Sequence, residues 1–585
     1  MSTILRRIAG WVALVLVLGG IAFATSRFIR TQSSNTIYIA VVGPMSGEDQ
    51  SLGDEIARGV HLYIDELNRA GGIDGKRVEV LVYDDMSDSD QAAVVAQQIA
   101  DSQAVLVIGH GYSSTSLAAG KIYRDAHIPA ITASATADDV TRDNPWYFRT
   151  IPNNHSQAVF LANYARSVLE QEKVNIVYDA GSYGSSLAIP FEKTFRGLGG
   201  KVQHVWNFDS DTPDLEQRLL QIVNEMVAVK SSEPGLVFLA TYTEEAVTLI
   251  REMRRKGLDD VILGGDAIGD PGVPSNFGLY PEEQARPGFF TDWIYSATTI
   301  MFDIAGENTQ RLLETYKETY NTTNPGWDVA TYYEAAQIAA QAIQRAGIAT
   351  HSGGREADRQ AIRAQLAQSN SLETAFTGLE DSVFFDEEHN AQKAIAIGIF
   401  NKQAFISAPT QLQLISDTGR IPNIDQAIKD GNVLLVDGKY MYQTNLVYTG
   451  LDFIEISDLD TKNSTFDADF FLWFRYHGNF DEKQIEFSNT TEPIELGEPV
   501  MQTVNGDETY RVYRVKSTFR ANFDYRDYPF DSQVLRLSFR HPFITRENLI
   551  YVPDVVGMRF RSGQDTVMRL LNAGAFKAGN NWKLQ

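Results

Sequence analysis

A regular alternation of short β-rich runs with helical runs constrains this chain more than any other feature, and it extends from Ile37 to about Phe405. Helices between consecutive strands require right-handed crossover connections, which give a parallel sheet with helices on both faces. Val- and Ile-rich runs bounded by turn residues predict the first strands at Ile37–Val42, Arg77–Tyr83, Ala104–Gly109 and Ile128–Thr132. These strands and the helices between them predict one α/β lobe.

The same alternation restarts after Tyr147–Pro152 and predicts a second lobe of the same kind. Its helices are predicted at Ser156–Leu169, Ser185–Leu198, Pro213–Val229 and Glu244–Lys256. Its strands are predicted at Val174–Tyr178, Val202–Trp206, Gly235–Ala240 and Val261–Gly265. Further helices (307–320, 331–346 and 356–369) and strands near 383–385 and 394–400 follow. Two such lobes, joined more than once, would leave a cleft between them.

At about Ala408 the pattern changes, and after a polar connector that ends at Asp437 the chain becomes β-rich. Small or apolar residues alternate with polar ones over Val515–Phe523, which is the period of a sheet with one wet face. Asn505-Gly506 is a strong signal for a two-residue hairpin. The strands are predicted at Tyr440–Ile456, Phe466–Tyr476, Thr509–Phe523 and Gln533–Phe539. Together they predict an all-β, immunoglobulin-like sandwich.

The first 30 residues contain the one segment with membrane character. Arg6-Arg7 precede an uncharged run from Ile8 to Ser26, and Arg27 follows it, so the run is near the length that spans a bilayer. This single N-terminal hydrophobic helix is either a cleaved secretory signal, with a small-residue site at Ala22-Phe23-Ala24, or an uncleaved signal anchor. Both interpretations leave the rest of the chain outside the cytoplasm, facing the periplasm or the cell exterior.

Charge and composition argue against several classes of function. The 585 residues include 51 Lys and Arg against 75 Asp and Glu, a formal net charge of −24, so the chain would repel a nucleic-acid backbone. The absence of cysteine removes disulfides, thiolate nucleophiles and Cys-ligated metals. The nine histidines show no paired metal-ligand spacing, and there is no nucleophile elbow, zinc-protease motif or P-loop. We therefore expect a binding protein without metal or cofactor, and neither an enzyme nor a nucleic-acid partner.

Five motifs, in order along residues 37–408, carry a family resemblance. They are Ile39–Gly47, Asn68–Gly75, Tyr83-Asp84-Asp85, Gly109–Thr115 and Ile128–Thr132. With them the α/β part resembles the type I periplasmic binding proteins, especially the branched-chain amino acid receptors of ABC importers. The resemblance implies two lobes that close over a small ligand.

Hydroxyl side chains gather where a ligand of such a fold would lie. Ser113, Ser114 and Thr115 follow a strand and open a helix, so hydroxyls and unpaired N–H groups converge where the helix dipole favours an anion. Ser134 and Thr136 follow a second strand, at the carboxyl edge where open α/β sheets bind ligands. A carboxylate would fit there. Simple capping of the helix is the commoner use of Ser and Thr at such a position, and it is compatible with ligand binding.

The resemblance also assigns roles to individual residues. It implies that Ser113, Ser134 and Thr136 hold the α-carboxylate and part of the ammonium group of an amino acid. It further implies that Tyr183 faces the cleft and that Glu245 faces the ammonium group.

Two points of this alignment stay open. Glu244 is a one-residue alternative to Glu245, and both glutamates also suit the first turn of an ordinary helix. Where many relatives present an aromatic residue to the ligand's side chain, this chain has Gln50-Ser51-Leu52. The class of ligand therefore carries over from the family, but the identity of the amino acid does not.

A loop near the C-terminus carries a second resemblance. Tyr528-Pro529-Phe530-Asp531, with Gln533 two residues later, lies within Ala521–Leu535. This segment resembles the signature loop of pentameric ligand-gated ion channels, of the prokaryotic type without cysteines. In that family the loop rests on the membrane-spanning domain, which implies a coupling role for Tyr528, Pro529, Phe530 and Asp531 and assembly as a homopentamer. An ordinary sandwich turn is the alternative interpretation.

Three functions follow from these observations. The first is an extracytoplasmic receptor that binds an amino-acid-like solute by lobe closure and relays the closure to a channel-type sandwich, whose membrane spans are missing from this sequence. The second is the solute receptor of an amino acid importer, and the third is the ectodomain of a transmembrane sensor with a cytoplasmic output. The predicted organisation is a membrane-associated signal or anchor at 1–30, a ligand-binding domain at 35–410, a linker at 411–436 and a C-terminally incomplete sandwich at 437–585.

Overall fold

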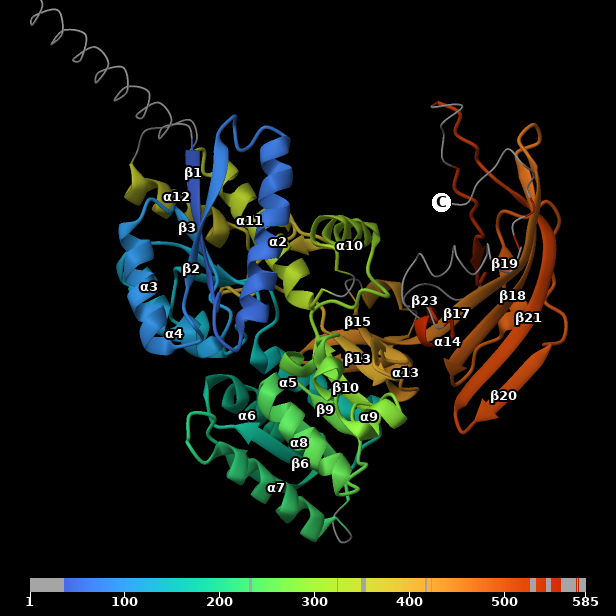
Figure 1. Ribbon diagram of the computed structural model, residues 1–585, viewed down its shortest axis with the longest axis horizontal. Helices are drawn as coiled ribbons and strands as arrows, with labels where there is room; N and C mark the ends of the chain where they lie inside the picture. Colours follow the sequence, from blue (N-terminus) through green and yellow to red (C-terminus); the bar gives the residue numbers. More distant parts are fainter. Residues whose placement is uncertain are drawn as a thin grey trace, which may run out of the picture. The chain divides into compact units, whose positions relative to one another are not determined.

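The computed structural model describes residues 36–230, 234–322, 325–348, 354–415, 418–421, 423–526, 533–542 and 549–558, together with 575 and 577 (Figure 1). The chain forms two compact units. Unit 1 is drawn from Met1–Asn153 and Asp328–Lys393, and unit 2 from Asn154–Trp327 and Ala394–Gln585. The chain therefore passes between the units more than once, as the sequence predicts for two lobes.

Unit 1 is built on a parallel sheet in the order β2-β1-β3-β4-β5. Its strands are β1 (Thr36–Gly43), β2 (Arg77–Asp84), β3 (Leu106–Ile108), β4 (Ala130–Thr132) and β5 (Tyr147–Arg149). A separate short hairpin pairs β11 (Phe376–Thr377) with β12 (Ser382–Val383). The parallel sheet predicted for the first lobe is confirmed.

Helices cover both faces of this sheet (Figure 1). One face carries α2 (Gln50–Arg69), α11 (Trp327–Arg345) and α12 (Arg355–Gln368), and the other carries α3 (Ser89–Asp101) and α4 (Ser113–Asp125). Alternate residues of β1 reach the two apolar clusters, because side chains of a strand point to opposite faces. Ile39 and Val41 join the first cluster, and Ala40 and Val42 join the second.

Unit 2 begins with a second α/β lobe, whose sheet has the order β14-β13-β10-β9-β8-β6-β7. Its five parallel strands are β6 (Lys173–Asp179), β7 (Lys201–Phe208), β8 (Leu236–Ala240), β9 (Ile262–Gly264) and β10 (Ile294–Thr298). Two antiparallel strands, β13 (Ala396–Asn401) and β14 (Ala404–Ser407), complete it.

The helices of this lobe also lie on both faces of the sheet. One apolar cluster contains residues of α5 (Asn154–Asn163) and α6 (Ser182–Gly197), and the opposite cluster contains residues of α7 (Leu215–Val229) and α8 (Thr243–Arg255). Two further helices of the unit are α9 (Pro281–Ala285) and α10 (Glu307–Tyr320). Both lobes thus have the doubly covered architecture that the alternating pattern predicts.

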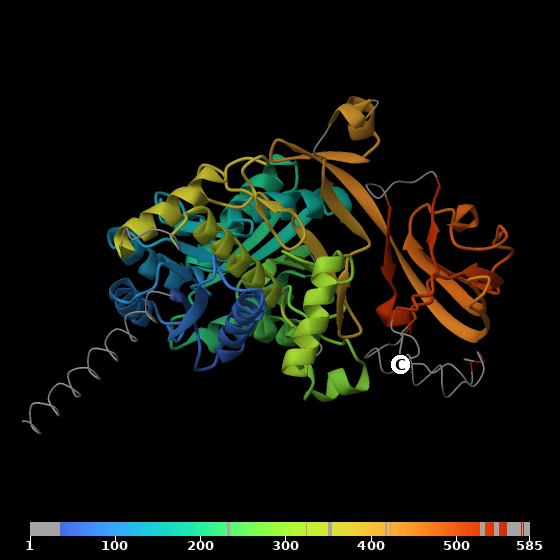
Figure 2. The ribbon, with the colours of Figure 1, turned by 90° about the horizontal axis from the view of Figure 1, so that it is seen from above.

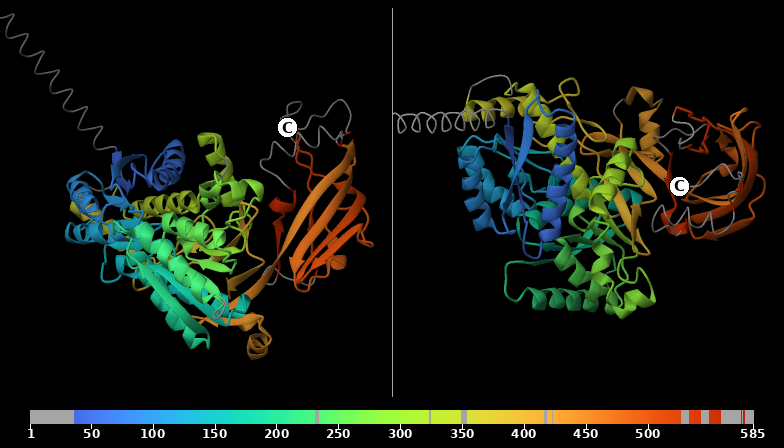
Figure 3. Two further views of the ribbon diagram at one scale, coloured as in Figure 1. Left: turned by 60° about the horizontal axis from the view of Figure 1, so that its bottom comes forward. Right: turned by 45° about the horizontal axis from the view of Figure 1, so that its top comes forward.

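The remainder of unit 2 is mostly β-sheet, with long curved strands that Figures 2 and 3 show in orange and red. Its large sheet follows the order β15-β17-β18-β21-β20, and β16 and β23 also pair with β17. These strands are β15 (Thr410–Leu414), β16 (Val433–Val436), β17 (Lys439–Asp460), β18 (Thr465–His477), β20 (Met501–Asn505), β21 (Glu508–Arg520) and β23 (Leu549–Pro553). A short pair, β19 (Glu486–Phe487) with β22 (Phe539–Arg540), and the helices α13 (Ile424–Lys429) and α14 (Val555–Met558) complete the region.

The β-region differs from the sequence prediction in three places. The predicted strand over 533–539 is present only at its end, in β22. The predicted connector 411–436 carries β15, α13 and β16, because Leu412, Val433 and Val436 supply buried apolar residues within a polar stretch. The predicted hairpin is present, but its two loop residues are Gly506 and Asp507, since Asn505 pairs with Glu508. An immunoglobulin-like sandwich stays a prediction.

Strand β17 connects the β-region to the second lobe. Its first residues pair with β15 and β16, and its later residues pair with β18 and β23. Leu446 and Tyr448 of β17 belong to the same apolar cluster as α5 and α6. The Tyr448 hydroxyl also donates a hydrogen bond to the Ser407 carbonyl at 2.5 Å. The second lobe and the β-region therefore share one core within unit 2.

Two predicted features lie outside the described residues. These are the N-terminal hydrophobic helix and the coupling residues Tyr528, Pro529, Phe530 and Asp531. Among the helices that the structure does describe, none combines the length and the apolar character needed to cross a bilayer.

Candidate ligand-binding site

The predicted anion-binding residues of unit 1 lie at the start of α4, directly after β3. Gly109 adopts a φ of 128°, a conformation that side chains rarely allow, and a Cβ there would also meet the carbonyl of Val42. This turn brings Ser113 to the first position of α4. Ser113 is buried, whereas Ser114 is exposed at the helix start.

Ser113 does not cap its own helix. Its Oγ accepts a hydrogen bond from the backbone N–H of Ala137 at 3.1 Å, and no side-chain cap bond is formed at Tyr112, the N-cap residue of α4. The simple capping interpretation of Ser113 is therefore not what its contacts indicate. The bond to Ala137 instead joins the start of α4 to the segment after β4, which carries the other predicted hydroxyls.

Ser134 braces this arrangement from the segment after β4. Its hydroxyl donates to the Gly111 carbonyl at 2.7 Å and lies 2.8 Å from the hydroxyl of Tyr332 on α11. Burial raises the pKa of Tyr332 well above its ordinary range, so that hydroxyl stays protonated. Ser134 is thus engaged with protein groups on both sides.

Thr136 differs from the other hydroxyls because its Oγ1 is buried and has no hydrogen-bond partner among the described residues. The residue is only 1% exposed. A buried hydroxyl without a partner costs about 1–3 kcal/mol, which makes this oxygen a candidate for a hydrogen bond to a ligand. We name Ser113, Ser114, Ser134 and Thr136 the hydroxyl half-site.

A buried cation lies next to this half-site. The guanidinium of Arg149, at the end of β5, donates to the carbonyls of Thr136 and Ala137 and to the hydroxyl of Thr141. Its side chain is fully buried, so its charge acts in a medium of low dielectric constant. Together with the N-terminus of α4, it favours an anion beside Thr136. The sequence analysis missed Arg149, because an arginine in a short strand carries no local signal of burial.

In unit 2, Tyr183 of α6 lies in a cluster of polar and aromatic groups. Its hydroxyl donates to Asp266 Oδ1 at 2.8 Å, and its ring stacks on Tyr242 with 4.7 Å between the ring centroids. Tyr242 is the N-cap residue of α8. Tyr183 is 3% exposed, and burial raises its pKa well above the ordinary range.

Asp266 is the acid that contacts Tyr183, and it follows β9 in a short 3-10 turn (Asp266–Ile268). The carboxylate is 3% exposed, and its Oδ2 has no hydrogen-bond partner among the described residues. Burial raises the pKa of Asp266, although the hydrogen bond from Tyr183 acts in the opposite direction. We name Tyr183, Tyr242 and Asp266 the acidic half-site.

Glu245 lies in the first turn of α8, as the alternative interpretation of the two glutamates predicts. Its carboxylate accepts a hydrogen bond from Thr241 Oγ1 at 3.3 Å. Burial raises the pKa of Glu245, and the charges of Asp179 and Glu244 add to the effect. No described hydrogen bond joins Glu245 to Tyr183, so its role toward a ligand stays a prediction.

Asp266 carried a usable sequence signal, because Gly264-Gly265-Asp266 follows a buried strand as Thr136 does.

The α/β part of the chain matches a known protein family. Residues 36–404 match the sequence profile of the family described as periplasmic binding protein, which is more than half of the chain. The chain belongs to the periplasmic binding protein family. Membership implies an extracytoplasmic location, and it confirms the first resemblance at the level of the family. Residues 405–585, and with them most of the β-region, lie outside the match.

Two curated relatives have amino acid ligands in their names. The Leucine-, isoleucine-, valine-, threonine-, and alanine-binding protein of Pseudomonas aeruginosa is 27% identical over 359 residues, which are 61% of this chain and 88% of that protein. The Leu/Ile/Val-binding protein of Escherichia coli K12 is 30% identical over 254 residues, which are 43% of this chain and 66% of that protein. Both are named as binding proteins and not as enzymes.

Solved structures share the fold of the two lobes. The branched-chain amino acid transporter substrate binding protein LivJ from Streptococcus pneumoniae, in complex with isoleucine, has a TM-score of 0.54 at 23% identity and covers 63% of this chain and 97% of its own. The solute binding protein of an ABC transporter from R. palustris, in complex with benzoate, has a TM-score of 0.53 at 20% identity and covers 64% and 95%. The channel-type resemblance of the β-region finds no counterpart in these matches and stays a prediction.

Proposed function

We propose that the protein is an extracytoplasmic receptor for a small amino acid, with the α-carboxylate on the hydroxyl half-site and the ammonium group on the acidic half-site. The observation that carries the proposal is a pair of buried, unpartnered oxygens of opposite chemistry. Thr136 Oγ1 can donate a hydrogen bond, and Asp266 Oδ2 can only accept one when ionised. Each lies just after a strand of its own parallel sheet, where ligands of open α/β folds bind.

The charges around the two oxygens support the same assignment. Beside Thr136 lie the N-terminus of α4 and the buried Arg149, which both favour a negative group. On the other side, Asp266 supplies a buried carboxylate oxygen that a cation would satisfy, while the hydroxyl of Tyr183 holds its second oxygen. A zwitterion satisfies both environments, whereas a simple carboxylate or a simple amine satisfies only one.

The names of the relatives agree with this class of ligand. The P. aeruginosa relative is named for five amino acids, which share the α-carboxylate and the α-ammonium group and differ in the side chain. The R. palustris structure carries benzoate, which has a carboxylate alone. These two cases define the comparison that tests the proposal.

The β-region extends the proposal to signal relay. The family resemblance implies that the lobes close over the ligand, and a shared core links the second lobe to the β-region. We propose that the β-region passes this movement to a membrane partner, through the predicted coupling residues Tyr528–Asp531. A solute receptor for an amino acid importer is the second candidate, and the likeness to LivJ, the substrate binding protein of a branched-chain amino acid transporter, favours it.

Isothermal titration calorimetry on the full chain tests the ligand class. The panel contains leucine, isoleucine, valine, threonine and alanine, then leucinamide, 4-methylpentanoate and benzoate. We expect at least one amino acid to bind, and leucinamide and 4-methylpentanoate to bind more weakly than leucine, because each removes one charge of the zwitterion. Tighter binding of benzoate than of every amino acid would contradict the proposed ligand class.

A further inference from the structure

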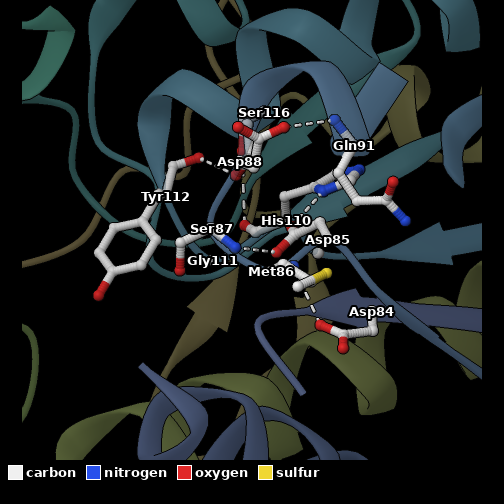
Figure 4. Close-up of polar contacts among 12 residues, drawn as sticks. Asp84, Asp85, Met86, Ser87, Asp88, Gln91, His110, Gly111, Tyr112 and Ser116 are labelled. Carbon is white, nitrogen blue, oxygen red and sulfur yellow. Dashed lines mark hydrogen bonds and ion pairs between the residues drawn. The ribbon is translucent and has the colours of Figure 1, made fainter. Parts of the chain in front are cut away.

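The loop between β3 and α4 contains a fully buried histidine that the proposed binding chemistry does not use. His110 Nδ1 lies 2.6 Å from Asp85 Oδ2, and both side chains are 0% exposed. His110 Nε2 lies 2.9 Å from the hydroxyl of Tyr123. Figure 4 shows His110 and Asp85 facing each other below the loop that leads to Tyr112.

The partners assign the protons of this chain of hydrogen bonds. An ionised carboxylate can only accept, so Nδ1 carries the imidazole proton and Nε2 accepts from Tyr123. Burial raises the pKa of Tyr123 well above its ordinary range, with Tyr147 and Asp85 adding to the effect, so its hydroxyl keeps the proton. Each ring nitrogen is therefore fixed by a partner of the correct kind, and the ring has one orientation.

The three residues come from different elements of unit 1. Asp85 follows β2 directly, His110 lies between β3 and α4, and Tyr123 lies in the last turn and a half of α4. The imidazole thus ties the start of α4 both to the neighbouring strand end and to the body of its own helix.

The backbone of the same loop is tied to the hydroxyl half-site. The His110 carbonyl accepts hydrogen bonds from Thr132 Oγ1 at 3.0 Å and from the Tyr332 hydroxyl at 3.3 Å. Ser134 bonds the next carbonyl, that of Gly111, and Ser113 bonds the N–H of Ala137. A rotation of the loop would therefore displace Ser113 and Thr136 together.

We propose that His110, held between Asp85 and Tyr123, is a positioning residue that orients the hydroxyl half-site toward the ligand's carboxylate. The proposal rests on the proposed function of that half-site. A buried hydrogen-bonded pair is by itself weak evidence of stability, because replacing both partners by apolar residues of the same shape can be nearly neutral. Apolar residues in these positions would not fix the orientation of the loop, whereas the two hydrogen bonds of His110 do.

The test compares affinity for L-leucine with affinity for L-leucinamide in the full chain. His110→Asn keeps a donor near the Nδ1 position but does not reach Tyr123, and Tyr123→Phe removes one hydroxyl. Ile362→Val is the matched control, because it opens a small gap in the core of unit 1 under α12 and touches none of the residues above. Calorimetry gives the two affinities, and thermal unfolding gives the stability of each variant.

We expect His110→Asn to weaken leucine binding about tenfold and Tyr123→Phe about threefold, with leucinamide affinity unchanged, so that the ratio of the two affinities falls. Ile362→Val should lower the melting temperature and leave that ratio at the wild-type value. If both variants fold and keep the wild-type ratio, His110 has only a structural role and the proposal is wrong, while the proposed function stands. If the wild-type chain binds none of the amino acids, the proposed function fails and this inference fails with it. Should His110→Asn not fold, Tyr123→Phe decides the question alone.

Discussion

The two half-sites follow one topological rule and differ in chemistry. Thr136 and Asp266 each follow a strand of a parallel sheet and each bury an oxygen without a partner among the described residues. The hydroxyl half-site has neutral donors near a buried arginine, whereas the acidic half-site has a carboxylate held by the hydroxyl of Tyr183, whose ring stacks on Tyr242. The fold therefore determines where a ligand group binds, and individual side chains determine which charge that ligand group must carry.

The half-sites also differ in how firmly their own unit holds them. Ser113 and Ser134 are hydrogen-bonded to the backbone of neighbouring segments, which leaves the Thr136 hydroxyl as the open group. In the acidic half-site Tyr183 holds one oxygen of Asp266, and the other stays open. This difference predicts that the carboxylate is recognised by geometry and the ammonium group by charge.

The largest expected effect comes from removing the charge of Asp266. Asp266→Asn should weaken leucine binding about 100-fold, because loss of one partner of a buried charge pair costs about 2–5 kcal/mol. Binding of 4-methylpentanoate, which lacks the ammonium group, should not change. Calorimetry with both compounds measures this, and equal losses for the two would show that Asp266 does not face the ammonium group. Asp303→Asn is the matched control, because Asp303 is an acid of the same unit that bonds Ser407 and belongs to neither half-site.

Thr136→Val should have a smaller effect with the opposite selectivity. It removes one hydrogen bond to a charged group, which is worth about 1.5–3 kcal/mol, so leucine binding should weaken about tenfold or more. Leucinamide binding should change little, and the unliganded chain should not lose stability, since the wild-type hydroxyl has no described partner. Thr518→Val, which removes the hydrogen bond to Asp467 in the β-region, should instead lower stability without changing affinity. If Thr136→Val weakened leucine and leucinamide binding equally, the hydroxyl half-site would not be specific for the carboxylate.

The pH dependence of the acidic half-site should follow from the raised pKa of Asp266. A carboxyl whose pKa is higher in the folded chain binds its proton more tightly there, so this group makes the unliganded protein less stable as pH rises through that window. Leucine binding has the opposite trend, because the ammonium group needs the ionised form, and affinity should fall as pH drops through the raised pKa. Thermal unfolding and calorimetry between pH 4 and pH 8 should show both slopes in wild type, and both should be shallower in Asp266→Asn, where other buried acids such as Glu245 still contribute to stability.

The smallest effect is expected from a change outside both half-sites. Tyr448→Phe removes the hydrogen bond to the Ser407 carbonyl, where β17 meets the second lobe, and should cost about 1 kcal/mol of stability. Leucine affinity should stay at the wild-type value. A tenfold change in leucine affinity would mean that the β-region takes part in binding in addition to the two half-sites.

Much of the architecture could be predicted from the sequence, and the reasons are local. The alternation of strands and helices is visible in short windows, and Ser113 and Thr136 follow strands that composition alone identifies. Arg149 was missed because an arginine in a short strand carries no local signal of burial. Asp266 was missed although it follows a buried strand, because its partner Tyr183 is 83 residues away in the sequence. Glu245 was favoured by alignment with a family, whereas its observed partner is the neighbouring Thr241.

In the β-region, too, the features that sequence could not predict are those that depend on partners distant in the chain. The long strands β17, β18 and β21 were predicted to within a few residues from their β-rich composition and, over Val515–Phe523, from the alternation of small or apolar residues with polar ones. Between residues 533 and 538 the chain has strand-like composition but forms no described strand, and only Phe539–Arg540 pairs with β19. Pairing partners, and not composition, decide such short segments.

Strand β17 also has a mechanical consequence. At about 3.3 Å per residue, its 22 residues extend over roughly 70 Å, with its irregular pairing confined to the part after Phe453. Leu446 and Tyr448 anchor the first half of the strand in the core of the second lobe, and the residues after Tyr448 extend about 40 Å further. A tilt of that lobe by about 5° would therefore move the far end by roughly 3.5 Å. A long strand of this kind acts as a lever arm, and it would convert a small rearrangement around a metabolite into a displacement comparable to the width of a side chain.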